Sequence, residues 1–284
     1  MIRDFFQIIL LGLTLACASS ALAIEDHPAP ITNQAWQEVV ISVFDAEKSS
    51  SFFTEIAGFE IIWHGAEKKE FLAHLGIENT ASAQSVVLKS PGSKTGYIRL
   101  IEFSGVNGQV PTRPGARTWD TGCFTSIMMR AKGLNSIYND AIKMDWWTET
   151  PITELKFGTS KLKIVIFKGP QGIQVEAYER LSPPLPQEFP EFKRLSLPFN
   201  IMQTVRNREA SRKFFVDQLG FKNFFNGPPV TAQKEAQMPL GIPLNFTTTS
   251  RYQAAILYPE PAETGRVELV EFMDLKGEDY YKNC

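Results

Sequence analysis

The chain has 284 residues, of which 43% are hydrophobic, and its formal net charge at pH 7 is -2. This composition is that of an ordinary globular protein, long enough for two modest domains. Because there is no excess of basic residues, nucleic acid is not an expected partner. Three cysteines are too few for a disulfide framework.

Residues 1–23 have the pattern of a secretory signal peptide. A basic Arg3 comes first, an apolar run follows, and Ala21-Leu22-Ala23 is a small-x-small cleavage site. The apolar run is short for a membrane span. We therefore expect a periplasmic or secreted protein whose mature chain begins near Ile24, with the signal peptide as its only contact with a membrane. An uncleaved anchor and a lipoprotein signal at Cys17 are the alternatives.

One pattern occurs twice in the remaining chain. Residues 38–59 and 200–221 each read as strand, polar cap, short helix, glycine and strand. Asp45 and Asn207 precede the two helical stretches, where a side-chain oxygen can accept from the first free amides. The glycine that follows each helix fits the left-handed position that ends many helices.

The two copies stay in step further along the chain. The expected last strand at 98–103 in the first copy corresponds to 267–272 in the second. A more diverged copy occupies residues 121–181, with a strand at 124–130, a helix at 134–142 and two later strands. The chain is therefore predicted to contain three units, each with one main helix and several strands.

These patterns resemble the vicinal oxygen chelate (VOC) superfamily, which includes glyoxalases, bleomycin-resistance proteins, extradiol dioxygenases and methylmalonyl-CoA epimerases. The resemblance rests on the two Ser-x-x-Phe-Phe helices, at Ser49 and Ser211, and on Gly169-Pro-Gln-Gly-Ile-Gln-Val-Glu176, which is similar to the family's Asp-Pro-Asp-Gly-x-x-x-Glu. It implies an α+β fold in which repeated βαβββ modules form curved mixed sheets around a cup. Because many chemistries occur on this scaffold, it implies a fold and not one reaction.

The resemblance also predicts the domain organisation. Residues 36–181 are expected to form a paired-module domain, residues 182–196 a proline-rich linker, and residues 197–284 a third module. Only twelve residues follow Phe272, too few for a fourth module, so the third module is expected to lack its partner. Its open sheet edge favours a homodimer through this module, with a shared oxygen-rich cup that suits a hard cation. A truncated gene product, or simple packing of the third module on the first domain, are the alternatives.

A metal in this family is held by side chains of the first and last strands of paired modules. The matching positions here hold Glu38, Ser126 and Asn200 on first strands, and Arg99, Glu176 and Glu268 on last strands. Arg99 has no lone pair to give a metal, and no histidine of the chain falls at a ligand position. The resemblance, with these departures, therefore predicts no metal and no other cofactor in the first cup; a divalent metal there stays the alternative.

Two functions remain open. The first is a protein that binds a small organic molecule without a metal; Trp146 and Trp147 are candidates for lining its cup, and its expected ligand-binding residues are Trp63, Ser126, Tyr178, Asn200 and Glu268. The second is a lyase, isomerase or dioxygenase of the superfamily. In that case Glu38 and Glu176 act as acid and base, or as metal ligands, while Arg99 holds an oxyanion. A structural ion network of these three residues is the simpler interpretation.

Overall fold

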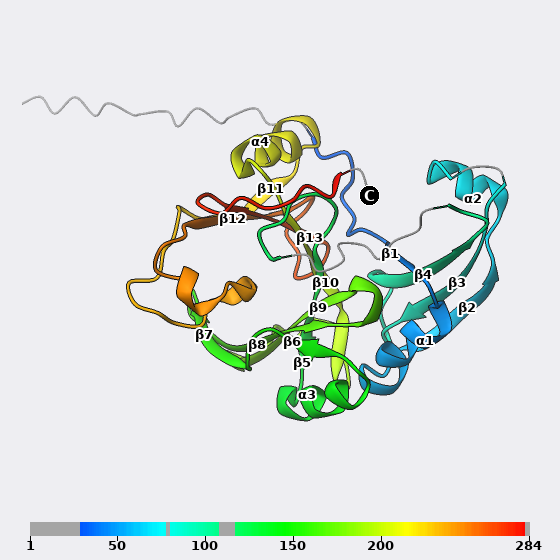
Figure 1. Cartoon of the computed structure of the whole chain (residues 1–284), viewed down its shortest axis with the longest axis horizontal. Helices are drawn as coiled ribbons and strands as arrows, with labels where there is room; N and C mark the ends of the chain where they lie inside the picture. The colour runs from blue at the N-terminus through cyan, green and yellow to red at the C-terminus, as the bar shows by residue number, and fades with distance from the viewer. Residues whose placement is uncertain (1–28, 78–79, 108–116, 282–284) are drawn as a thin grey trace, which may run out of the picture.

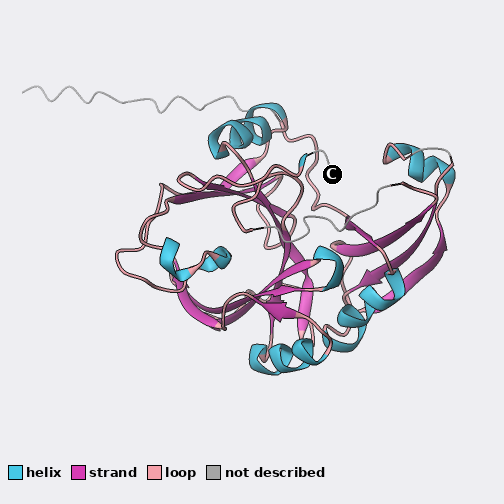
Figure 2. Cartoon of the chain, in the orientation of Figure 1, coloured by secondary structure: helices cyan, strands magenta, loops and turns pink. Residues whose placement is uncertain are grey.

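The computed structural model describes residues 29–77, 80–107 and 117–281. Their strands form two mixed sheets, one of four strands and one of nine. In Figure 1 the small sheet lies on the right, and the large sheet curves around the left half of the molecule. Figure 2 shows that the helices lie outside the curve of the large sheet, apart from short turns within it.

Module 1 is the four-stranded sheet with its helices. Its elements are β1 (Glu38–Val43), α1 (Ala46–Ser51), the π-helical turn η1 (Phe52–Ile56), β2 (Glu60–Ala66), α2 (Lys69–His74), β3 (Ser82–Lys89) and β4 (Tyr97–Ser104). The strand order is β1-β4-β3-β2, with β1 parallel to β4. Among the described residues, β1 hydrogen-bonds to no strand other than β4, so its outer edge is open.

Modules 2 and 3 together make the nine-stranded sheet. Module 2 consists of β5 (Ser126–Ala131), α3 (Leu134–Lys143), β6 (Trp147–Thr148), β7 (Thr153–Phe157), β8 (Ser160–Lys168), η2 (Pro170–Gly172) and β9 (Gln174–Ser182). Module 3 consists of β10 (Leu195–Thr204), α4 (Arg208–Lys213), η3 (Phe214–Gln218), β11 (Lys222–Asn226), η4 (Pro239–Gly241), η5 (Leu244–Phe246), β12 (Tyr252–Tyr258) and β13 (Arg266–Phe272). The order is β11-β12-β13-β10-β5-β9-β8-β6, and β7 pairs with β8.

Strand β10 pairs with β5 in antiparallel fashion, with Asn200 opposite Met128 and Met202 opposite Ser126. The expected pairing of modules 1 and 2, and the expected lack of a partner for residues 197–284, are therefore wrong. Because the first-strand edge of module 3 is used within the chain, the reason for a homodimer through that module is removed as well.

Aromatic packing accounts for the position of module 1. Phe52 stacks on Trp146 with ring centroids 3.8 Å apart, and Phe53 meets the same indole edge-on. All three rings are buried in one core that also holds the outer face of β5, where Ile127 and Met129 lie. Module 1 therefore packs by its helix on the outside of module 2, which leaves the β5 edge free for β10. Trp146 belongs to this core and does not line a cup.

The proline-rich segment 182–196 is not an exposed linker between domains. Phe189 and Phe192 are buried, and both pack in a cluster with Leu197 and Phe199 of β10. The segment connects β9 to β10 inside one continuous sheet, so its aromatic side chains pack on the apolar residues of β10.

The predicted helix ends are confirmed. The side chain of Asp45 accepts from Lys48 N at 2.8 Å, and that of Asn207 accepts from Ala210 N at 2.8 Å. Gly58 and Gly220 have φ of +77° and +70°, in the left-handed region. One more cap was not predicted: the last strand of each module supplies a glutamate to the helix start, Glu102 to Ala46 N and Glu271 to Arg208 N.

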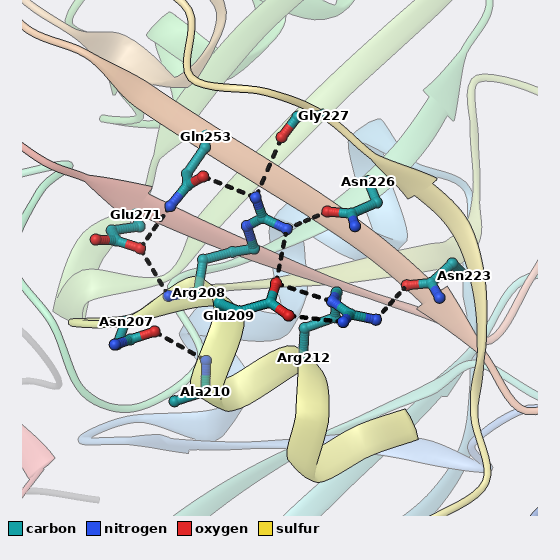
Figure 3. Close-up of polar contacts among 10 residues, drawn as sticks. All are labelled: Asn207, Arg208, Glu209, Ala210, Arg212, Asn223, Asn226, Gly227, Gln253 and Glu271. Atoms are coloured by element: carbon teal, nitrogen blue, oxygen red, sulfur yellow. Dashed lines mark hydrogen bonds and ion pairs between the residues drawn. The ribbon is translucent and has the colours of Figure 1, made fainter. Parts of the chain in front are cut away.

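Arg208 joins helix α4 to the sheet (Figure 3). Its buried guanidinium donates to Asn226 Oδ1, Gly227 O and Gln253 Oε1, all on or beside β11 and β12. Its acceptors are thus mostly neutral oxygens. Both Nη groups of this buried guanidinium therefore have acceptors within the fold, while its Nε has none among the described residues.

Residues after β13 run back to the start of module 2. Tyr280 N donates to Thr121 O, and Thr121 N donates to Glu278 O. The segments approach so closely that a side chain at Gly122 or Gly277 would clash with backbone. Among the described residues no helix is long and apolar enough to span a membrane; the expected signal peptide, residues 1–23, lies outside them.

Candidate functional site

The concave face of the nine-stranded sheet forms a cup at the junction of modules 2 and 3. Because side chains alternate along a strand, every second residue of β5, β9, β10 and β13 faces inward. The central inward residues are Ser126 and Met128, Glu176 and Tyr178, Asn200 and Met202, and Glu268 and Val270. Antiparallel pairing of β5 with β10 relates module 2 to module 3 by a local two-fold, so that Ser126 corresponds to Asn200 and Glu176 to Glu268.

Each of the two carboxyl groups has neutral polar neighbours. Glu176 is 0% exposed and accepts from Ser126 Oγ at 2.9 Å and Tyr178 OH at 2.7 Å. Glu268 accepts from Asn200 Nδ2 at 2.9 Å, and the same amide lies 3.0 Å from Met128 Sδ. Five residues that the sequence singled out are thereby brought together.

No described lysine, arginine or histidine forms an ion pair with Glu176 or Glu268. Burial raises the pKa of both carboxyls, and the neighbouring Glu176 charge adds to the rise for Glu268, whose pKa is about 8. Burial likewise raises the pKa of Tyr178. At neutral pH the Glu268 carboxyl therefore carries a proton and can donate a hydrogen bond.

The amide of Asn200 is only half satisfied. The residue is 2% exposed, and its Oδ1 has no hydrogen-bond partner. An unpaired buried acceptor costs free energy. The unpaired oxygen beside the Glu268 carboxyl marks this end of the cup as a place where a polar group is missing.

Apolar side chains fill the rest of the cup. Leu240 and Ile242 are buried in one cluster with Met128, Met202 and Phe199. They belong to the segment between β11 and β12, drawn in orange inside the curve of the sheet in Figure 1. Thr118 Oγ1 donates to Leu240 O and holds this segment in place.

Glu38 and Arg99 lie elsewhere, on module 1. Arg99 Nε and Nη2 donate to the Glu38 carboxylate at 2.9 and 3.1 Å, and Nη1 donates to Glu67 at 2.6 Å. Trp63 contributes a cation-π contact, 5.6 Å from its ring to the guanidinium. The expected grouping of Glu38 and Arg99 with Glu176 is therefore wrong, because modules 1 and 2 share no sheet; Glu67 takes the place that Glu176 was given.

Comparisons with known proteins bear on the fold. No family model and no curated protein matches the chain. Glyoxalase I from Zea mays has a similar structure, with 16% identity, a TM-score of 0.54, and 85% of this chain and 69% of that chain covered. This chain has a glyoxalase-like fold. Weaker matches include a putative dioxygenase from Bacillus subtilis (11%, TM-score 0.48, 86% and 66% covered) and a glyoxalase family protein from Bacillus cereus (15%, 0.45, 53% and 97%).

The α+β class with mixed sheets around a cup, expected from the sequence, is confirmed. The resemblance seen in the sequence assigns metal ligands to inward positions of first and last strands, and in this cup those positions hold Ser126, Glu176, Asn200 and Glu268. These donors do not fit a transition metal. The described residues contain no cluster of three or more His, Cys, Asp or Glu side chains, and Ser126 and Asn200 use their hydrogens on the two carboxyls. A hard cation needs six or more oxygens, whereas apolar groups occupy the remaining directions.

Proposed function

We propose that the chain is an exported VOC-fold protein that binds a small organic molecule in the cup of modules 2 and 3, without a catalytic metal. One observation carries the proposal: Asn200 Oδ1 is a buried acceptor without a partner among the described residues, next to the carboxyl of Glu268, whose pKa burial raises to about 8. An acceptor and a donor side by side suit a hydroxyl, amide or carbonyl group of a ligand.

The apolar cluster around these two groups supplies the surface for the ligand's carbon skeleton. Leu240 and Ile242 now occupy that volume. Entry of a ligand therefore requires the segment between β11 and β12 to move away from the sheet. The ligand class that follows is a small, largely apolar molecule with one neutral polar group.

Binding can be tested by thermal shift and calorimetry on the mature chain. Benzamide and benzyl alcohol serve as neutral ligands with one polar group each. Asn200→Leu should lose at least tenfold in affinity for both, because a leucine fills the same volume without the acceptor. Asn223→Leu, at an exposed asparagine, is the matched control. Equal affinity in the Asn200→Leu variant would contradict the proposal, as would no binding by the wild type.

The metal-independent part has its own test. After dialysis the purified protein should carry well under one equivalent of nickel, zinc, iron or manganese by elemental analysis. Stoichiometric metal that disappears in Glu176→Gln and Glu268→Gln variants would show that the two carboxyls turn toward a cation and that this part of the proposal is wrong.

Proton transfer is the second candidate, and the Glu268 pKa of about 8 favours it, because a general acid or base works best when its pKa lies near the working pH. The catalytic pair is then Glu268 and Glu176 in place of Glu38 and Glu176. A turnover screen with a keto-aldehyde thioadduct, a catechol and an acyl-CoA epimer would test it. Turnover that falls in Glu268→Gln but not in Glu260→Gln, at an exposed glutamate, would establish an enzyme.

Export rests on the sequence of residues 1–23. N-terminal sequencing of the purified native protein should find a start near Ile24, in a periplasmic or secreted fraction. An intact Met1 in that material would contradict export.

A further inference from the structure

Three arginines meet at one end of the same cup. Arg130 follows from β5, Arg180 from β9 and Arg266 from β13, and strand alternation places all three on the inward face. In the paired strands β5 and β9, Arg130 lies opposite Tyr178, two residues before Arg180. The cluster therefore lies beyond Tyr178, farther along β5 and β9 than Glu176.

Arg130 is buried without the partners that a guanidinium needs. It is 5% exposed, and its guanidinium donates no hydrogen bond to any described residue. The ring of Phe199 lies 4.0 Å from its charged carbon and covers one face. Arg180 is only partly buried, but no described residue accepts a hydrogen bond from it, and its buried Nε has no partner. The Nη groups of both side chains therefore have no hydrogen-bond acceptor among the described residues.

Among the described residues one carboxylate, that of Glu263, pairs with two of the three arginines. Arg266 Nη2 donates to Glu263 Oε1 at 3.2 Å, and Arg130 Nη2 lies 3.9 Å from Glu263 Oε2. Arg266 also donates to Ala262 O at 2.9 Å. Three positive charges against one negative charge leave an excess of two. Burial, together with the repulsion of Arg180 and Arg266, lowers the pKa of Arg130 to about 10.

Arg208, another buried arginine, differs from Arg130 because its guanidinium has hydrogen-bond acceptors within the chain. Its guanidinium has three neutral oxygens and Glu209 as acceptors (Figure 3). A buried guanidinium without acceptors costs free energy that the protein offsets elsewhere. Arg130 and Arg180 lie on the paired strands β5 and β9 without acceptors among the described residues. This indicates that their acceptors come from another molecule.

We propose that Arg130, Arg180 and Arg266 form a binding site for an oxyanion, either a carboxylate or a phosphate group. The planar fork of a guanidinium matches two oxygens of either group. This site adjoins the Asn200 and Glu268 groups, because Arg266 is the register partner of Asn200, but its charge and geometry do not depend on the function proposed above. An exposed aromatic ring lies beside it: the Phe224 ring centroid is 3.9 Å from the guanidinium carbon of Arg266. This ring suits an anion with an apolar body.

The experiment is calorimetric titration of the mature chain, in a low-salt buffer without multivalent anions, with inorganic phosphate, acetate and benzoate. We expect saturable binding at one site. Arg130→Met and Arg180→Met should each weaken it at least tenfold, whereas Arg251→Met, which removes an exposed arginine paired with Asp274, should not. Phosphate tighter than benzoate would identify a phosphate site; benzoate tighter than phosphate and acetate would identify an organic acid site. Either supports the proposal, and no saturable binding of any of the three overturns it.

A second readout covers the case in which Arg130→Met does not fold. Arg180 is only partly buried, so Arg180→Met removes repulsion and should raise Tm in anion-free buffer. Phosphate should then raise Tm of the wild type and not that of the variant, since only the wild type gains from a bound anion. Arg180→Lys keeps the charge but loses the fork, and should show an intermediate shift. Equal anion-induced shifts in wild type and Arg180→Met would overturn the proposal.

Discussion

Modules 1 and 3 place opposite charges at the same position of the fold. Arg99 on β4 and Glu268 on β13 correspond in the repeated pattern, and each lies beside the first strand of its module. In module 1 the Arg99 guanidinium forms ion pairs with two carboxylates, those of Glu38 and Glu67. In the cup, Glu268 faces Glu176 with no cation in contact, and its pKa rises to about 8. One residue type thus decides whether a carboxyl cluster is an ion network that holds structure or a proton-holding pair open to chemistry.

The largest expected effect comes from breaking the ion network. Arg99→Met leaves Glu67, whose side chain is 7% exposed, without its cation. We expect the free energy of unfolding to fall by ~3 kcal/mol, within the range for a partly buried ion pair that loses one partner. Chemical denaturation at pH 7 measures it. Arg251→Met, which breaks an exposed pair with Asp274, should lower the free energy of unfolding far less, because water and salt screen a surface pair; similar losses in both variants would contradict the contrast.

Glu176 and Glu268, the two carboxyls of the cup, should make the free energy of unfolding depend on pH in the opposite way to an ion pair. A carboxyl with a raised folded-state pKa stabilises the fold at low pH, and this stability is lost as pH rises from its ordinary value, 4.5, through about 8. We expect the free energy of unfolding to decrease by ~2 kcal/mol between pH 5 and pH 9.

Glu268→Gln should remove most of that decrease and be more stable than wild type at pH 9. Denaturant melts across this range provide the measurement, with Glu260→Gln, at a partner of exposed Lys222, as control. A pH dependence unchanged by Glu268→Gln would mean that the carboxyl stays ionised and has found a cation.

A smaller effect should follow from loss of the hydroxyl that holds Glu176. Tyr178→Phe removes a 2.7 Å hydrogen bond and should cost ~1 kcal/mol at pH 7. Because that bond favours the charged form of Glu176, the variant should also shift the pH dependence to higher pH. Thermal unfolding at pH 6 and pH 8 would reveal both changes; Tyr138→Phe, at a tyrosine outside the cup, should show neither.

Local signals in the sequence, together with the family resemblance, were enough for the elements and for the inward positions. Asp45, Asn207 and the two helix-ending glycines predicted where helices begin and end, because capping depends on a few adjacent residues. Ser126, Glu176, Asn200 and Glu268 were singled out because the family resemblance assigns ligand positions to the first and last strands. Tyr178 was singled out as an aromatic residue that could line the cup, and it lies beside Glu176.

The choice of partner module could not be predicted in this way. The first strands β1, β5 and β10 each present a similar edge, so alternation alone allows any two to pair. The contact that decides is the stack of Phe52 on Trp146, between residues far apart in the chain. Glu67 was missed for a related reason: it comes just after β2, outside the repeated pattern, and only the folded sheet brings it to Arg99.

Strand β5 is synthesised well before β10, since the rest of module 2 and the segment 183–194 lie between them. In the finished sheet β10 and β13 lie beside β5 and β9. There Glu176 is buried and Glu268 is partly buried, and burial raises the pKa of both carboxyls. At neutral pH the joining of β10 and β13 to the sheet must take up a proton from the surrounding solution, so completion of the cup is coupled to the acidity of the compartment in which the chain folds.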